Sequence, residues 1–148
     1  MQKISLGFLV LLVLLISPVM AEEVKDDIIA RGDMVVTKDL LIYQITKPGD
    51  GAVAQVGDNV EVHYTGWLVD GTKFDSSLSR DKSFHFQIGA HRVIPGWERG
   101  VAGMRVGETR ELIIPAKLAY GKQGAGGGII PPDAVLLFEI NLLSIGKR

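Results

Sequence analysis

The chain has 148 residues, no cysteine and a formal net charge of −1 at pH 7. The absence of cysteine excludes disulfide bonds, so the fold must depend on a hydrophobic core, which a single domain of this length can supply. The near-neutral charge excludes the strongly basic surface with which proteins bind nucleic acid or anionic membranes, and we expect neither as a partner.

The first 21 residues are typical of a secretory signal peptide. Lys3 gives the segment a positive start, residues 4–16 form an apolar run, and Ser17-Pro18 leads to a small residue at Ala21. The apolar run is shorter than the roughly 20 residues of a membrane-spanning helix. We expect cleavage after Ala21, with retention as an uncleaved anchor as the alternative.

Cleavage after Ala21 leaves a mature chain of 127 residues with 15 basic and 17 acidic groups. The final residues, 145–148, contain no signal for retention in the endoplasmic reticulum. We therefore expect a periplasmic or extracellular protein of a bacterium, without stable membrane association after cleavage.

The mature chain begins with a lead-in over residues 22–38, which is charged and has no sustained hydrophobic period. We expect at most an edge strand there, around residues 34–36. From residue 39 onward, apolar runs with a period of two alternate with turns rich in glycine and proline, as in a succession of β-strands. The predicted strands are 41–45, 60 to the Asp70-Gly71 hairpin turn, 83–87, 109–114 and 135–144.

A single short helix is expected from Pro95 through residues 97–104, because two glycines keep it short. Residues 116–120 have room for one further helical turn. The elements predict an α+β fold in which a mostly antiparallel sheet carries the helix on one face. By the period-two rule, the predicted core residues are Val62, Phe86, Leu136 and Ile140.

Seven short motifs, taken together and in order, resemble the FKBP family of prolyl isomerases over residues 39–145. They are Val62-His63-Tyr64-Thr65-Gly66, Asp70-Gly71-x-x-Phe74-Asp75-Ser76-Ser77, Phe84-x-Phe86, Val93-Ile94-x-Gly96-Trp97, Ala119-Tyr120-Gly121, Ile129-Ile130-Pro131-Pro132 and Leu136-x-Phe138. The resemblance implies an isomerase domain over residues 39–148, built as a five- to six-stranded antiparallel sheet wrapped around one short helix, with a ligand pocket between them.

The resemblance also implies which residues form the pocket. Those that would act in catalysis are Tyr64, Phe74, Asp75, Tyr120 and Phe138, and those that would bind substrate are Phe84, Val93, Ile94, Trp97 and Ile130. In the family, the backbone N–H that matches Ile94 and the phenol that matches Tyr120 bind substrate carbonyls. Six of the ten aromatic residues of the chain fall in this set, and a small domain normally exposes so much aromatic surface only where it meets a ligand.

The implied activity is peptidyl-prolyl cis-trans isomerisation of exported proteins during their folding. Rotation about an X-Pro bond transfers no proton and needs no nucleophile, metal or cofactor, and Asp75 is expected to act electrostatically or structurally. The implied partners are X-Pro-containing polypeptides and macrolide inhibitors of the FK506 and rapamycin type, and we expect a monomer. The alternative is a non-catalytic module or holdase chaperone that grips proline-containing segments.

Three other interpretations are weaker. The spacing of His63, His85 and His91 fits no zinc site, and we expect solvated histidines. The serines after Asp75 lack a G-x-S-x-G elbow, which argues against a hydrolase. Residues 121–128 are rich in glycine but lack the Gly-Lys-Ser/Thr ending of a phosphate loop, so we predict a flap beside the pocket.

Overall fold

The computed structural model describes residues 28–31 and 34–146, so the predicted signal peptide and residues 22–27 and 32–33 of the lead-in lie outside the described residues. Within these ranges, eight strands form one antiparallel sheet. The strands are β1 (Ile28–Arg31), β2 (Met34–Thr37), β3 (Ile42–Lys47), β4 (Asn59–Leu68), β5 (Lys73–Ser76), β6 (Phe84–Gln87), β7 (Thr109–Ile114) and β8 (Leu136–Gly146).

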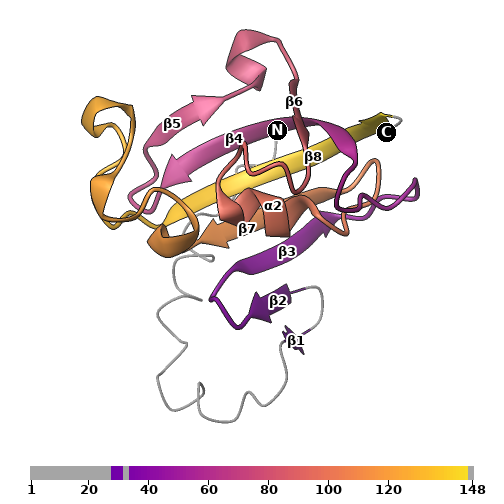
Figure 1. Cartoon of the computed structure of the whole chain (residues 1–148), viewed down its shortest axis with the longest axis horizontal. Helices are drawn as coiled ribbons and strands as arrows, with labels where there is room; N and C mark the ends of the chain where they lie inside the picture. Colours follow the sequence, from indigo (N-terminus) through magenta and orange to yellow (C-terminus); the bar gives the residue numbers. More distant parts are fainter. Residues whose placement is uncertain (1–27, 32–33, 147–148) are drawn as a thin grey trace.

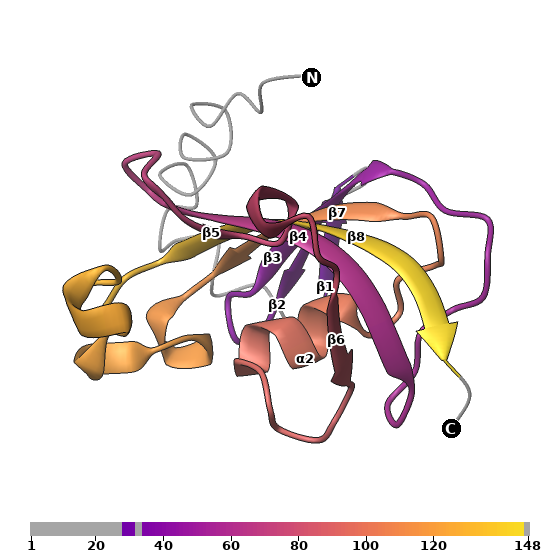
Figure 2. The same cartoon turned by 90° about the horizontal axis from the view of Figure 1, so that it is seen from above.

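The strand order is β1-β2-β3-β7-β8-β4-β5, and β6 pairs with the first part of β4 on the same side as β5. The long strands β4 and β8 pair along almost their whole length and form the centre of the sheet. Figure 1 shows the sheet face-on, and Figure 2 shows that it curves around the helix α2 (Pro95–Val101). The α+β class and the antiparallel sheet around one short helix are therefore confirmed.

Helix α2 lies close to the sheet because two of its residues are glycines. A β-carbon at Gly96 would come within 2.4 Å of Ile114, and one at Gly100 within 2.7 Å of Leu112, both in β7. A hydrogen bond also links β7 to α2, because Arg110 Nη1 donates to the Gly100 carbonyl at 3.0 Å. The helix ends at Val101, three residues before the predicted end, where Gly103 adopts a positive φ of 85°.

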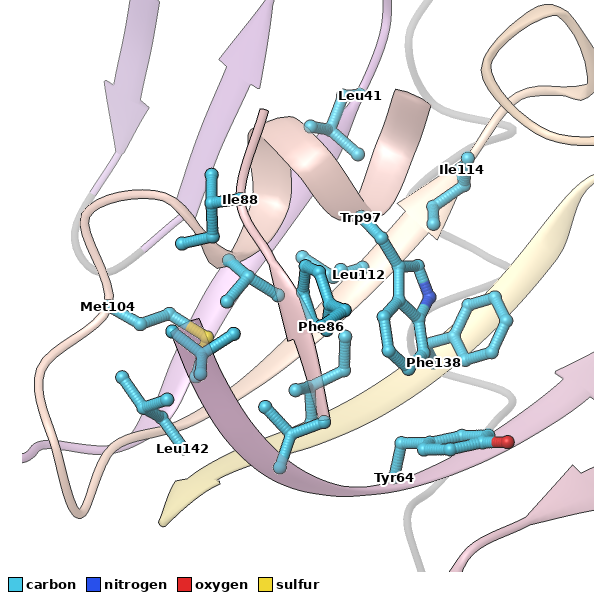
Figure 3. Packing of buried hydrophobic residues seen from close by; sticks show 14 of the residues in the cluster. Leu41, Tyr64, Phe86, Ile88, Trp97, Met104, Leu112, Ile114, Phe138 and Leu142 are labelled. Atoms are coloured by element: carbon cyan, nitrogen blue, oxygen red, sulfur yellow. The ribbon is translucent and has the colours of Figure 1, made fainter. Parts of the chain in front are cut away.

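The concave face of the sheet and α2 enclose the main core (Figure 3). The predicted core residues Val62, Leu136 and Ile140 are fully buried, and Phe86 is 7% exposed, so this part of the prediction is confirmed. Short 3-10 turns of three residues each lie in the connections between strands. These turns are η2 (Leu78–Arg80), η3 (Ala116–Leu118), η4 (Gly121–Gln123) and η5 (Gly126–Gly128). The turn η3 confirms the helical turn expected after residue 115.

Two features of the sheet differ from the prediction. It has more strands than the five or six expected, because β1 and β2 of the lead-in pair with each other and extend it beyond β3. A second apolar cluster of Ile42, Ile113 and Leu137 is buried on the outer face. The period-two rule assigned the outer face to polar residues and missed this cluster, since it lies inside continuous apolar runs. None of the helices in the described part of the chain has the length and apolar character needed to cross a membrane.

Candidate functional site

The indole of Trp97 is the centre of an aromatic cluster between α2 and the sheet. Pro95 supplies the first position of α2, where a missing N–H costs no hydrogen bond, and Trp97 follows two residues later. Trp97 is 4% exposed, and its ring centroid lies 4.9 Å from Tyr64 and 5.3 Å from Phe138, both nearly edge-to-face. Figure 3 shows these two rings on the same side of the indole.

Two further phenylalanines surround this centre. Phe84, which is 36% exposed, lies 5.8 Å from Trp97 and 5.9 Å from Tyr64, and Phe74 lies 5.6 Å from Phe138, measured between ring centroids. Edge-to-face contacts of this kind stabilise ring pairs beyond the burial of their area. The apolar surface is thus made rigid by its own packing.

A polar network lies at the edge of the aromatic cluster. The Tyr64 hydroxyl donates a hydrogen bond of 2.5 Å to Asp75 Oδ2, and Arg80 Nη2 donates one of 2.9 Å to the same hydroxyl. Arg80 Nη1 forms an ion pair with Asp75 Oδ1. Ser77 fixes the backbone of β4 at Tyr64, because its Oγ accepts a hydrogen bond of 2.8 Å from the Tyr64 N–H.

The charges of this network follow from the surroundings. Burial alone would raise the pKa of Asp75, but the hydrogen bonds from Tyr64 and Arg80, together with the charge of Arg80, hold its pKa below the ordinary 3.8. Burial and the hydrogen bond to Asp75 raise the pKa of Tyr64. At neutral pH the network therefore consists of a carboxylate, a neutral phenol and a guanidinium.

The segment before α2 contains an unused backbone donor. Ile94, the residue before Pro95, has extended dihedral angles of −59° and 147°, and its carbonyl accepts the Trp97 N–H at 2.9 Å. Its own N–H makes no hydrogen bond within the described residues. Glu98 fixes the preceding turn, because its carboxylate accepts hydrogen bonds from the backbone N–H groups of Gly89 and His91.

The glycine-rich segment after Tyr120 is ordered by short contacts. Ala125 and Ile130 exchange two backbone hydrogen bonds of 3.0 and 3.1 Å. Gly124 has a φ of 64°, and a β-carbon there would lie 2.2 Å from the Ile130 carbonyl oxygen, so only glycine fits. Ile130 is buried, whereas Tyr120 is 41% exposed and its hydroxyl has no hydrogen-bond partner within the described part of the chain.

The structure thus brings the ten predicted pocket residues together to different degrees. Direct ring contacts or hydrogen bonds join Tyr64, Phe74, Asp75, Phe84, Trp97 and Phe138. Val93, Ile94 and Ile130 belong to the same apolar cluster. Tyr120 has no direct contact of this kind, and burial and then the negative charge of Asp75 raise the pKa of its phenol.

A hollow of about 630 Å³ lies beside the aromatic cluster, along β6, and shares two predicted pocket residues with it. It is lined by Asn59, Phe84, His85, Phe86, Gln87, Ala90, Arg92 and Val93. Phe84, which contacts Trp97, therefore joins the aromatic cluster to a partly polar depression.

Comparison with known proteins decides the family. The profile of the FKBP-type peptidyl-prolyl cis-trans isomerases matches residues 51–143, which is more than half of the chain. The chain belongs to this family. An "FK506-binding protein" of Neisseria meningitidis is 48% identical over 105 residues, which are 71% of this chain and 95% of that protein.

Two further FKBP relatives support the assignment. The "FK506-binding protein 2" of Yarrowia lipolytica is 59% identical over 92 residues, 62% of this chain, and the match covers 63% of that protein's length. The crystal structure of AtFKBP13 superposes with a TM-score of 0.72 at 38% identity, over 78% of this chain and all of that one.

The FKBP site contains residues that the sequence analysis missed. Arg80 orders Asp75 and Tyr64, Ser77 holds the backbone of Tyr64, and Gly66 leaves room for two pocket rings. The position of Arg80 five residues after Asp75 was a signal in the sequence for an ion pair between them. The pair forms only because the turn η2 brings the two side chains together, and the sequence alone did not predict that turn. The expectation of solvated histidines is wrong for His63, because it is half-buried and its Nδ1 lies 2.9 Å from Ser77 Oγ.

Proposed function

We propose that this FKBP-family protein accelerates cis/trans rotation of X-Pro peptide bonds, with the proline ring held on the indole of Trp97. The observation that carries the proposal is the arrangement of the rings. Four aromatic side chains contact the buried indole, three of them nearly at right angles, while a single charged network stands at their edge. This arrangement offers an apolar surface for a pyrrolidine ring and a fixed electrostatic field for the amide beside it.

The chemistry follows from the electronic structure of the amide. Resonance opposes rotation with a barrier of about 18–20 kcal/mol. In the twisted transition state, the nitrogen lone pair no longer conjugates with the carbonyl, so the amide is less polar than in either planar state. An apolar pocket therefore binds the twisted amide better than the planar one, which is differential transition-state binding. Lowering the barrier by about 4–7 kcal/mol would shorten the uncatalysed time of tens to hundreds of seconds to milliseconds.

The polar groups have positioning roles in this proposal. The free Ile94 N–H and the Tyr120 hydroxyl bind carbonyl oxygens of the substrate on either side of the proline. Asp75 stays ionised, because Tyr64 and Arg80 lower its pKa, and its carboxylate faces the twisting carbonyl. No residue exchanges a proton with the substrate, since rotation breaks no bond to hydrogen.

We place the protein in the periplasm or outside a bacterial cell, where it would act on exported proteins as a monomer. The support is the apolar segment at residues 4–16 and the small residue Ala21 that follows it. Amino-terminal sequencing of the protein recovered from the periplasm or medium tests this placement. The expected first residue is Glu22, and an intact Met1 on membrane-bound protein would contradict it.

An exchange measurement by NMR on a short Leu-Pro peptide tests the proposed activity. We expect an exchange rate that rises in proportion to the protein concentration and that falls when a macrolide of the FK506 type occupies the pocket. Absence of acceleration by folded protein, together with suppression of aggregation of an unfolded client, would instead identify a holdase.

A further inference from the structure

The strand β6 has an unpaired edge that lies along the hollow. β6 pairs with β4 through Val60↔Phe86 and Val62↔Phe84, and within the described residues no strand pairs with its other side. All four residues of β6 line the hollow, together with Asn59 of β4 and with Ala90, Arg92 and Val93 of the connection to α2. Its volume of about 630 Å³ lies within the range of ligand sites.

The hydrogen-bond pattern shows which backbone groups of β6 point into the hollow. The Ile88 N–H donates to the Asp58 carbonyl at 3.0 Å, so Ile88 is in a hydrogen-bonded pair with β4. Antiparallel strands alternate hydrogen-bonded and non-hydrogen-bonded pairs. Phe84 and Phe86 therefore bond to β4, whereas the N–H and C=O of His85 and the N–H of Gln87 point away from the sheet.

The side chains around this edge alternate in character. On one face, Phe84 contacts Trp97 of the pocket and stacks on Phe86, and Val93 lines the same hollow. On the other face, His85 has a side chain that is 68% exposed. A strand laid along β6 would therefore meet apolar groups with every second side chain and water with the others.

We propose that the free edge of β6 binds the extended segment that flanks the X-Pro bond, by adding it to the sheet as a further strand. The inference rests on the proposed function, because the aromatic pocket fixes the proline and the hollow is continuous with it through Phe84 and Val93. Main-chain hydrogen bonds at the edge supply affinity with little dependence on sequence. The protein would thereby prefer extended, unfolded chains over isolated X-Pro dipeptides.

A ladder of peptides tests the proposal on the unaltered protein. The core peptide is Ala-Leu-Pro-Phe, and two longer peptides add Thr-Val-Thr-Val before or after it. We expect one of the longer peptides to bind about tenfold more tightly by titration calorimetry, because its added segment forms main-chain hydrogen bonds with the edge. In an added strand, every second N–H faces β6 and the others face away. N-methylation of the residues whose N–H faces β6 should remove the gain in affinity, and N-methylation of the alternate residues should leave it.

Two variants of one residue form the matched test on the protein. His85→Pro removes the outward N–H together with the imidazole, whose Nε2 lies 3.6 Å from Glu61 Oε1, at a position where an edge strand accepts proline, and should abolish the gain. His85→Ala keeps the N–H and should retain the gain. Neither variant should change the isomerisation rate of the core peptide. If His85→Pro does not fold, the N-methylated peptides alone decide.

The outcomes separate this inference from the proposed function. The edge site would be overturned if neither longer peptide bound more tightly than the core peptide. It would also be overturned if the gain in affinity were the same for both patterns of N-methylation and unchanged in His85→Pro. Failure of the protein to accelerate rotation in the core peptide would instead overturn the isomerase activity. The calorimetric comparison of the three peptides would still test the edge site, because binding is measured without turnover.

Discussion

Gly66 lies in β4 where two pocket rings converge, and Gly66→Ala tests how closely the pocket is packed. A β-carbon there would lie 2.6 Å from Phe74 Cζ and 2.7 Å from Phe138 Cε1. Because carbon atoms in contact settle at about 3.5–4.0 Å, each ring would have to move by about 1 Å. Phe138 is 5% exposed and packs against Trp97, so the movement meets a filled core.

We expect Gly66→Ala to lower the free energy of unfolding in urea by about 1–3 kcal/mol, as overpacked cores do. Because a displacement of about 1 Å at a reacting site can cost up to roughly a hundredfold in rate, kcat/KM for a Leu-Pro peptide should fall at least about tenfold. Gly146→Ala is the matched control, since a β-carbon there would lie 3.6 Å from Asn59, an ordinary contact. Wild-type stability and rate in Gly66→Ala would refute the described ring packing.

Three further predictions concern charge. Arg80→Met should raise the pKa of Asp75 in an NMR titration and lower kcat/KM several-fold, and an unchanged pKa would disprove the ion pair's role. For the unaltered protein, the rate should be flat between about pH 5 and 8 and decline only as Asp75 is protonated below 3.8, whereas a bell-shaped profile would indicate proton transfer. Glu139 lies opposite Glu111 across β7 and β8, and burial raises the pKa of both. The folded state thus holds protons on these two groups more tightly, so the contribution of the pair to stability is fully present below the unfolded pKa and is lost as pH rises through the folded pKa. Glu139→Gln should therefore stabilise by roughly 0.2–1 kcal/mol at pH 7 and not at pH 3, as thermal melts can check.

The strands and the core were predictable because they depend on local patterns. β7 begins and ends at the residues predicted, since a glycine turn precedes it and a proline follows it. Val62, Leu136 and Ile140 are buried because a period of two places every second side chain on one face. The aromatic residues of the cluster were predicted from the resemblance of the motifs to a family. The order and spacing of such motifs relate residues that are distant in the sequence, whereas hydrophobic periodicity relates only near neighbours.

The rest of the site depends on pairings between segments that are distant in sequence or on the conformation of a turn. Arg80 reaches Tyr64 and Asp75 only because η2 reverses the chain after β5. The space that Gly66 leaves for Phe138 exists only once β4 and β8 are in register. The unpaired edge of β6 likewise follows from sheet topology, and no property of the residues in that strand indicates it.

The cis/trans exchange rate of a Leu-Pro peptide with Phe138→Ala tests the central claim most directly. Phe138 contacts Trp97, Tyr64 and Phe74 and makes no hydrogen bond with its side chain, so the variant removes apolar surface alone. If rotation is accelerated by an apolar pocket, the folded variant should lose at least about tenfold in kcat/KM, a change of 1.36 kcal/mol or more in the barrier. Full activity in a variant whose circular dichroism matches that of the unaltered protein would contradict the account.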